Sequence, residues 1–373
     1  MSDRTPTIHD VAARCGVNAS TVSRAFTRPE RVSPTTRDRI LATAAEMGYR
    51  PNAIARALPS GRTRTLGLLV PDITNPFFLD LIRGAERAAT AAGYTLVLAD
   101  TEETSQQETT VVERLTGAVD GFVLASSRAS DERLREIHAK TRVVVVNRRV
   151  RPLPGVLIDS AHGTRQAAEH LASLGHRRIA YLAGPRASWS DARRWRTLQA
   201  VARHRDLEVV RIGPLAPTVD AGMAAADSAV LDDVTAVVTF NDLLAIGVLR
   251  RLRDRGIDVP GQISVVGCDD IFGADFCHPS LTTLAAPIES AGRSAVDLLL
   301  GLLASDRPRP GDAQGAEGGE GAEGAGAGED VVLPTRLTIR ESTGPAPGRA
   351  RGRSPRQRAA TDRRTARAVG ATG

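Results

Sequence analysis

The sequence is short of lysine, cysteine and aromatic residues. Of the 49 basic residues in its 373, only Lys140 is a lysine, and aromatic residues make up 3%. Its three cysteines, Cys15, Cys268 and Cys277, are odd in number and show no Cys-x-x-Cys spacing. This argues against a disulfide framework and against a zinc site. We therefore expect free thiols in a reducing compartment, with no metal and no cofactor.

Signals for membranes and export are also missing. No apolar run approaches the ~18 residues of a membrane span, and the N-terminus, MSDRTPTIHD, lacks the apolar segment of a signal peptide. A cytoplasmic protein is therefore expected. Apolar residues nevertheless make up 42% of the chain, which is ample for the cores of two or three domains.

Charge is distributed unevenly along the chain. Residues 1–65 hold 11 arginines and five acidic residues, and residues 345–373 hold eight arginines and one aspartate. Since the formal net charge is only +6, the region between them is acidic overall. A basic head on an acidic body indicates an anionic partner that docks at the N-terminus.

The head is predicted to form three short helices over residues 7–50. Thr7, Asn18 and Ser33 are suited to N-caps, and Gly16 to the turn between the first two helices. Two short helices joined by such a turn form a helix-turn-helix. The side chains expected to face inward are Ile8, Val11, Ala12, Val22, Ala25, Phe26, Ile40, Leu41 and Ala44.

The exposed face of the second helix carries small polar groups and one arginine. Arg24 can donate two hydrogen bonds to a guanine edge, and hydroxyl groups suit phosphates. A plain three-helix bundle with a solvated polar face is the alternative. Together with the segment that follows, the candidate DNA contacts are Thr7, Ala19, Ser20, Thr21, Ser23, Arg24, Arg31, Asn52, Ala55 and Leu58.

The motifs D-V-A, A-x-x-G-V, T-V-S-R, V-S-x-x-T-R and G-Y-x-P-N occur in order in this head. In these motifs the chain resembles the N-terminal domain of the LacI/GalR family of bacterial repressors, with Asn18 in place of the usual serine. The resemblance implies that Ala19, Ser20 and Arg24 read bases, although Ala19 offers only an apolar contact. It also implies that residues 51–58 form a hinge helix on DNA, which wedges Leu58 into the minor groove. A leucine resting on the next domain is the alternative, and Pro59 leaves the length of that helix open.

From Arg64 onward, apolar strands alternate with amphipathic helices. This rhythm predicts parallel sheets covered on both faces, in a periplasmic-binding-protein-like core of two doubly wound α/β subdomains with a cleft between them. The expected strands are 66–70, 95–99, 121–125, 143–146, 178–182, 207–211, 236–239 and 263–267, and the helices include 79–92, 106–115, 163–174 and 243–255.

Amides, carboxylates, one arginine and aromatic rings follow the carboxyl ends of these strands, where ligands bind in such folds. The combination suits a polyhydroxylated ligand, because amides and carboxylates bind hydroxyl groups and rings cover the apolar faces of a sugar. Structural roles compete: Phe77 and Phe78 as core residues, Asn241 as a helix cap, and Trp189 as packing at the cleft rim. The candidates for binding an effector are Asp72, Phe77, Phe78, Asn147, Trp189, Arg194, Asn241 and Asp269.

The body carries further motifs of the same family: V-P-D-I-T-N-P-F-F, L-A-G-P, F-N-D-L-L-A-I-G, I-S-V-V-G-x-D-D, H-P-S-L-T-T and T-I-R-E-S-T. The resemblance, which covers about residues 5–306 and 331–344, implies that Asn147, Arg194, Asn241 and Asp269 contact the effector. Thr197 stands where relatives often carry glycine, which leaves the start of that helix open.

The predicted organisation has four parts. They are a helix-turn-helix domain (1–50), a hinge helix and linker (51–65), an effector-binding and dimerisation core (66–344) and a disordered basic tail (345–373). Within the core we expect an N-subdomain of about 66–160 plus 288–306 and a C-subdomain of about 161–287 plus 331–344. The Gly/Ala/Glu-rich segment between them is expected to be a disordered insert at 307–330. The tail either adds affinity for phosphates or is an inert extension.

The expected function is a sequence-specific DNA-binding repressor that responds to a small carbohydrate-like effector. Two heads that read a palindromic operator require a homodimer. The sequence after Thr343 contains no leucine heptad, so a dimer is favoured over a larger assembly. The alternative is a sugar-binding module without regulatory DNA binding. An enzyme is not expected, because the P-loop, G-x-S-x-G and H-E-x-x-H motifs are missing.

Overall fold

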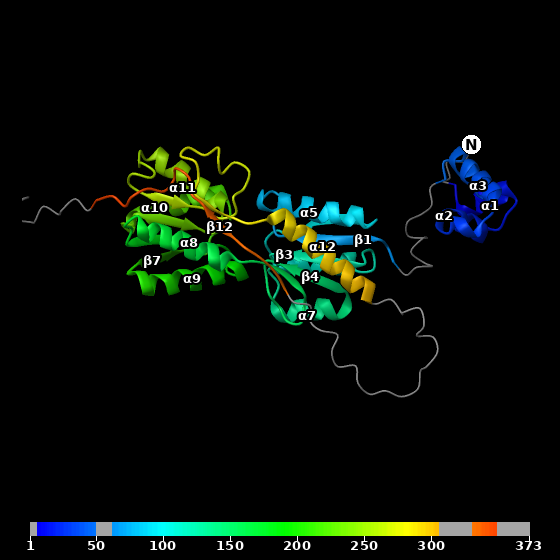
Figure 1. Cartoon of the computed structure of the whole chain (residues 1–373), viewed down its shortest axis with the longest axis horizontal. Helices are drawn as coiled ribbons and strands as arrows, with labels where there is room; N and C mark the ends of the chain where they lie inside the picture. The colour runs from blue at the N-terminus through cyan, green and yellow to red at the C-terminus, as the bar shows by residue number, and fades with distance from the viewer. Residues whose placement is uncertain (1–5, 50–61, 306–329, 349–373) are drawn as a thin grey trace, which may run out of the picture.

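A computed structural model describes residues 6–49, 62–305 and 330–348 (Figure 1). The head consists of α1 (Ile8–Cys15), α2 (Ala19–Thr27), the 3-10 helix η1 (Pro29–Arg31) and α3 (Pro34–Glu46). The backbone N–H and side-chain hydroxyl of Thr7 each donate to the Asp10 carboxylate over 2.7 Å, so Thr7 caps α1 as predicted. Gly16 ends α1 in a left-handed conformation, with φ 60°, which opens the turn into α2.

The head has its own small core, built from all three helices. Val11, Val22 and Ile40 are completely buried in it. The prediction that Leu41 faces inward is wrong, because its side chain is 38% exposed. Helix α3 packs through Ile40 and Ala44, one turn apart, and Leu41 lies outside this stripe and outside the head core.

The first subdomain contains a six-stranded sheet in the order β11-β5-β4-β3-β1-β2, and every pairing in it is parallel. Its strands are β1 (Thr65–Val70), β2 (Thr95–Asp100), β3 (Gly121–Ala125), β4 (Arg142–Val146), β5 (Gly155–Ile158) and β11 (Val331–Leu333). Its helices are α5 (Phe77–Ala91), α6 (Ser105–Leu115), α7 (Asp131–Lys140) and α12 (Ile288–Ser305).

Alternate residues of these strands face opposite layers of helix. On β1, Leu66 and Leu68 pack with α5 and α12, whereas Leu69 packs on the other face with α6 and α7. Both faces are therefore buried, which explains the nearly continuous apolar runs in the sequence.

The second subdomain repeats the plan with a parallel sheet in the order β7-β6-β8-β9. Its strands are β6 (Arg178–Leu182), β7 (Glu208–Ile212), β8 (Ala236–Thr239) and β9 (Ser264–Val266). Helices α8 (Ser160–Ser173) and α9 (Trp189–Arg205) cover one face, and α10 (Val219–Leu231) and α11 (Asp242–Asp254) cover the other. The short strands β10 (Thr283–Ala285) and β12 (Arg336–Thr338) pair antiparallel beside it.

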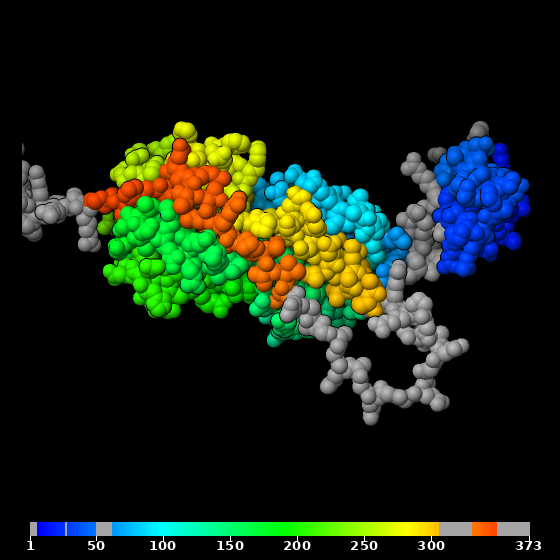
Figure 2. All heavy atoms as spheres, viewed as in Figure 1, coloured from blue at the N-terminus to red at the C-terminus, as the bar shows by residue number. Residues whose placement is uncertain are grey.

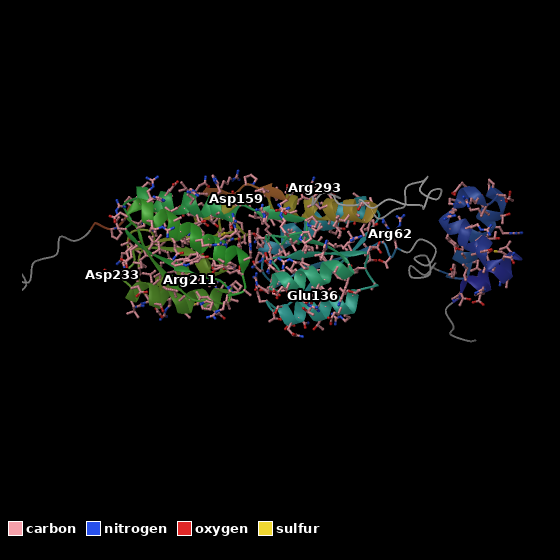
Figure 3. The ribbon with its side chains drawn as sticks, turned by 90° about the horizontal axis from the view of Figure 1, so that it is seen from below. Arg62, Glu136, Asp159, Arg211, Asp233 and Arg293 are labelled. Atoms are coloured by element: carbon pink, nitrogen blue, oxygen red, sulfur yellow. The ribbon has the colours of Figure 1, made fainter. Side chains whose placement is uncertain are left out.

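The chain passes between the subdomains three times, after β5, after β10 and after β11. The first passage runs through Asp159, which caps α8 (Figure 3). The last lies along both subdomains (orange in Figure 2). The expectation that all of 331–344 belongs to the C-subdomain is therefore wrong, because β11 pairs with β5 in the first sheet.

The predicted tail also begins differently, since residues 345–348 are described and the backbone N–H of Ala346 donates to the Leu174 carbonyl over 2.8 Å. The hinge helix, most of the Gly/Glu-rich insert and the rest of the tail lie outside the described residues. Within the described residues, no helix is long and apolar enough to cross a membrane.

Candidate functional site

One candidate surface lies on the head, along the outer side of α2. Ser20 and Arg24 are exposed there one helical turn apart, and the Arg24 guanidinium donates to the Ser20 hydroxyl over 3.4 Å. Thr21 and Ser23 are half-buried, and Ala19 packs partly against the head core. Arg24 is thus the one cation among the candidates on this helix face, and it lies free of the head core.

The other candidate DNA contacts on the head differ in whether the side chain is free to reach DNA. Thr7 is engaged in capping α1, and Arg31 is exposed at the end of η1. Asn52, Ala55 and Leu58 lie outside the described residues.

A second site lies between the subdomains. Five of the eight effector candidates, Phe77, Phe78, Asn147, Arg194 and Asp269, come together there. They line two small adjoining cavities of about 10 and 30 Å³, which share Phe77, Asn147, Arg194 and Asp269 as walls and which we call the inner pocket. Each cavity has room for about one or two water molecules, so the subdomains are nearly closed on each other here.

Turns at the strand ends aim these side chains. Two of these residues come directly after a strand: Ser126 after β3, with φ 48°, and Asn147 after β4, with φ 58°. Asp269 lies three residues beyond the end of β9 and has φ 120°. Such positive φ values are unfavourable for residues with a side chain and are found at ligand sites more often than elsewhere. Asn147 is held in this conformation by a 2.7 Å hydrogen bond from its backbone N–H to the Val156 carbonyl.

Unpartnered buried polar atoms concentrate in the inner pocket. Among the described residues five buried side-chain atoms have no hydrogen-bond partner, and three of them, Asn147 Oδ1, Ser160 Oγ and Arg194 Nε, belong to residues of this pocket. A buried polar atom without a partner costs about 1–3 kcal/mol. An acceptor, a hydroxyl and a donor left open around one space form a site for a ligand with several hydroxyl groups.

Two ionisable groups of the pocket, Arg194 and Asp269, form a buried pair. Arg194 and Asp269 are only 7% and 10% exposed, and their nearest side-chain atoms lie 3.8 Å apart. Arg194 also donates to the Phe240 carbonyl, and its guanidinium lies 5.1 Å from the centre of the Phe240 ring. Burial raises the pKa of Asp269 to about 8, against the opposing attraction of Arg194. The carboxyl is therefore largely protonated at neutral pH and can donate a hydrogen bond.

Three candidates lie outside the inner pocket. Asn241 is buried, and its amide oxygen caps α11 by accepting from the Leu244 N–H over 3.0 Å. Its amide nitrogen donates to the Pro217 carbonyl over 3.1 Å. Asn241 therefore has the helix-capping role that the sequence offered as the alternative. Trp189 is half-buried under the Arg193 guanidinium, 4.9 Å from the ring centre. Asp72 lies nearer the surface, where it holds a turn by accepting from Thr74.

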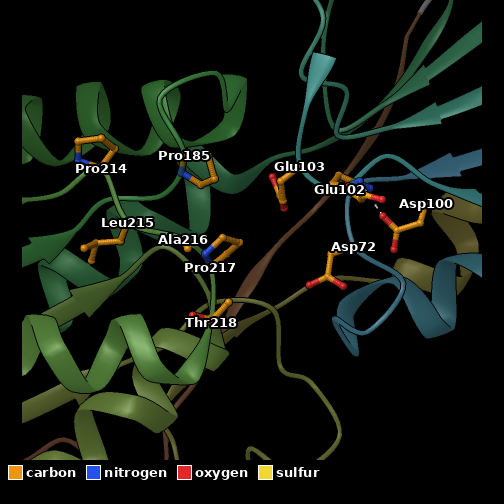
Figure 4. A pocket seen from close by; sticks show the side chains of 11 residues that line it. Asp72, Asp100, Glu102, Glu103, Pro185, Pro214, Leu215, Ala216, Pro217 and Thr218 are labelled. Atoms are coloured by element: carbon orange, nitrogen blue, oxygen red, sulfur yellow. Dashed lines mark hydrogen bonds between the residues drawn. The ribbon is translucent and has the colours of Figure 1, made fainter. Parts of the chain in front are cut away.

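Asp72 belongs to a larger cavity of about 480 Å³ at the mouth of the cleft (Figure 4). One wall carries the carboxylates of Asp72, Asp100, Glu102 and Glu103, and the opposite wall is formed by Pro185 and residues 214–218. Glu103 lines both this cavity and the inner pocket.

Sequence reasoning missed several residues of the inner pocket. Ser126 and Arg128 follow the predicted strand 121–125, so the strand-end rule could have found them. Arg128 is buried, and its guanidinium donates to Glu103 over 2.6 Å and to the Ser126 carbonyl over 2.7 Å. Ser160 follows β5, whose four residues were not predicted as a strand.

The raised pKa of Asp269 predicts a pH-dependent cost in stability. Above about pH 4, the unfolded chain releases a proton that the folded chain keeps up to about pH 8, so the free energy of unfolding falls as pH rises through that window. Asp269→Asn should remove this contribution. Urea unfolding at about pH 5 and pH 8 should show a smaller loss of stability in the variant than in the unchanged protein. Asp242, whose pKa burial raises to about 6, keeps a slope of the same sign in both.

The exposed Asp220→Asn serves as the matched control and should follow the unchanged protein. An equal loss of stability in Asp269→Asn and in this control would contradict a buried, protonated Asp269.

Comparison with known proteins identifies the two parts of the molecule. Residues 7–52 match the family model of bacterial regulatory proteins of the lacI family, and residues 168–343 match the periplasmic binding protein-like domain. The chain is 35% identical over 305 residues to the HTH-type transcriptional repressor CytR of Escherichia coli K12, covering 79% of this chain and 89% of that one. The chain belongs to the LacI family.

Solved structures agree with this membership of the LacI family. The lac repressor dimer bound to operator and the anti-inducer ONPF has a TM-score of 0.77 and 25% identity, covering 91% of this chain and all of that one. The transcriptional regulator CelR in complex with cellobiose has a TM-score of 0.64 and 29% identity, covering 90% and 99%. This LacI-family protein is accordingly a DNA-binding transcription regulator with a periplasmic-binding-protein-like core, as the sequence predicted.

Proposed function

We propose that the inner pocket binds a small neutral carbohydrate, and that this effector controls how the two heads of a cytoplasmic homodimer hold a palindromic operator. The open acceptor of Asn147, the open donor of Arg194 and the open hydroxyl of Ser160 carry the proposal. They match the hydroxyl groups of a sugar, and the half-buried Phe77 ring offers a surface for its C–H face. Sugar complexes of related regulators support the same ligand class.

The ligand should be neutral rather than strongly charged. Each guanidinium of the inner pocket faces a carboxyl group, Arg194 with Asp269 and Arg128 with Glu103. Glu103 neutralises Arg128, and the protonated Asp269 leaves Arg194 as the one unbalanced charge among these groups, which hydroxyl oxygens can accept from. The carboxylates of Asp72, Asp100 and Glu102 at the mouth of the cleft disfavour a strongly anionic ligand.

Effector binding in the pocket affects the heads by changing the relative position of the two subdomains. Residues from both subdomains line the pocket, so a ligand there changes the free energy of closing one on the other. We favour induction, in which the closed, effector-bound form releases DNA. Linkage requires that operator DNA then weaken effector binding by the same factor.

A gel-shift assay tests the proposal. The full chain should shift DNA from upstream of its own gene, and one member of a panel of neutral mono- and disaccharides should change that shift at saturating concentration. DNA binding that no sugar alters would overturn the carbohydrate assignment. Sugar binding without any operator shift would instead favour a sugar-binding module.

Leu58 provides a second test of how the heads hold DNA. If it wedges into the minor groove, Leu58→Ala should keep binding to nonspecific DNA but lose operator bending, because the kink depends on an apolar side chain between base pairs. Bending is measured by circular-permutation gel shift or by energy transfer between the two ends of the operator. Unchanged bending in the variant would exclude the wedge.

A further inference from the structure

A separate cavity of about 430 Å³ lies in the second subdomain, outside the inner pocket. The edge strand β7, the first turns of α9 and the loop before α9 form its walls. Its lining includes Arg186, Asp191, Trp195, Arg196, Arg211 and Pro214, and we call it the arginine cavity. Only Pro214 also lines the mouth of the effector cleft, and no residue of the arginine cavity lines the inner pocket.

Arg211, labelled in Figure 3, is held in place by a hydrogen-bond network through a buried carboxylate. Its guanidinium donates to Asp191 over 2.7 Å, and the Asp191 side chain is only 3% exposed. The same carboxylate accepts from the Tyr181 hydroxyl (2.7 Å) and from the Gly184 backbone N–H (2.8 Å). Arg211 is therefore preorganised, and most of its N–H donors remain for another partner.

An aromatic ring completes this arrangement. Trp195 stacks on the buried Tyr181 with ring centres 6.0 Å apart and an interplanar angle of 15°. The Arg211 guanidinium lies 5.5 Å from the centre of the Trp195 ring. An arginine that contacts only solvent requires no fixed position, whereas a binding site gains affinity from donors that are already held in position.

The charge of the arginine cavity is unbalanced. Its one carboxylate, Asp191, is already engaged by three donors. Within the described residues, Arg186 and Arg196 are not paired with any carboxylate, and both are exposed. Three guanidinium groups therefore converge on one cavity with a single neutralising charge.

We propose that the arginine cavity binds the phosphate group of a small organic phosphate. Planar guanidinium groups bind phosphate oxygens in pairs, and arginine is preferred where such recognition is needed. The volume falls within the ~300–1,000 Å³ of small-molecule sites, which leaves room for an organic part beside Trp195. This second site does not depend on the proposed sugar or on the head.

Calorimetric titration of the full chain with inorganic phosphate, at constant ionic strength, tests the site directly. We expect saturable binding, weakened about tenfold or more in the double variant Arg186→Gln, Arg196→Gln, because both side chains lose their charge-assisted hydrogen bonds to phosphate. Both residues are exposed, so the variant should fold normally, which circular dichroism checks. Arg211→Gln should weaken binding to a similar extent.

The matched control removes the same charge elsewhere on the second subdomain. Arg165→Gln with Arg203→Gln changes two exposed arginines of α8 and α9 that do not line the cavity. Phosphate affinity should remain that of the unchanged protein. A titration that does not saturate, or equal affinities in the cavity variant and the control, would show that phosphate binds only through general positive charge and would overturn the proposal.

Discussion

An Arg194→Ala variant should bind operator DNA as tightly as the unchanged protein and should no longer respond to the effector. Arg194 lies in the core, on α9, and its described contacts are with Phe240 and Asp269 rather than with the head. Arg194 offers the effector an open charged donor, and a hydrogen bond from a charged group is worth ~1.5–3 kcal/mol. The effector Kd should therefore rise by roughly 10-fold or more.

The measurement pairs a gel shift of the operator with calorimetry of the effector. Arg203→Ala is the matched control, because it removes an exposed arginine from the same helix. If the volume lost at position 194 prevents the core from folding, Arg194→Met keeps most of the side-chain volume and tests the same contact. Normal release of Arg194→Ala from the operator by effector would show that the effector does not bind in the inner pocket.

Most strands of the two parallel sheets were predictable, because a parallel strand buried on both faces leaves a continuous apolar run. Residues 121–125 and 178–182 match β3 and β6 to the residue. The carboxyl ends of such strands meet at one edge of each sheet, so Asn147 after β4 and Asp269 after β9 could each be placed at the cleft between the two sheets.

What the sequence did not reveal depends on contacts between distant segments. Strand β11 has only three residues, and it pairs with β5, which lies more than 170 residues earlier in the chain. Ser160 reaches the pocket because it follows β5, which ends at the edge of the sheet that faces the cleft. Local periodicity holds no signal for either.

Residue type alone does not separate ligand contacts from structural roles at two positions. Asn241 follows a strand end, as a ligand contact would, but both ends of its amide are used by the backbone around it. Arg128 was not singled out from the sequence, and it is buried beside Glu103 at the wall of the pocket. Distinguishing them requires knowing which hydrogen bonds the fold already satisfies.

Loss of Arg24 should abolish operator preference while leaving most nonspecific DNA binding. Arg24 is exposed on α2, free of the head core and one turn from Ser20, so its guanidinium can approach a base edge. A two-donor contact from arginine to guanine is worth ~1–3 kcal/mol. Since a palindromic operator holds two heads, Arg24→Ala should cost about 2–6 kcal/mol, or roughly 30-fold to 10⁴-fold in operator affinity.

The matched control is Arg39→Ala, which removes an equally charged, exposed side chain from α3. Fluorescence anisotropy with operator and with a scrambled duplex, at one salt concentration, separates base reading from phosphate attraction. Arg39→Ala should weaken both duplexes by the same small factor, whereas Arg24→Ala should weaken the operator far more than the scrambled duplex. If both variants weakened both duplexes alike, Arg24 would contact phosphates only, and operator sequence would have to be read by other residues of the head.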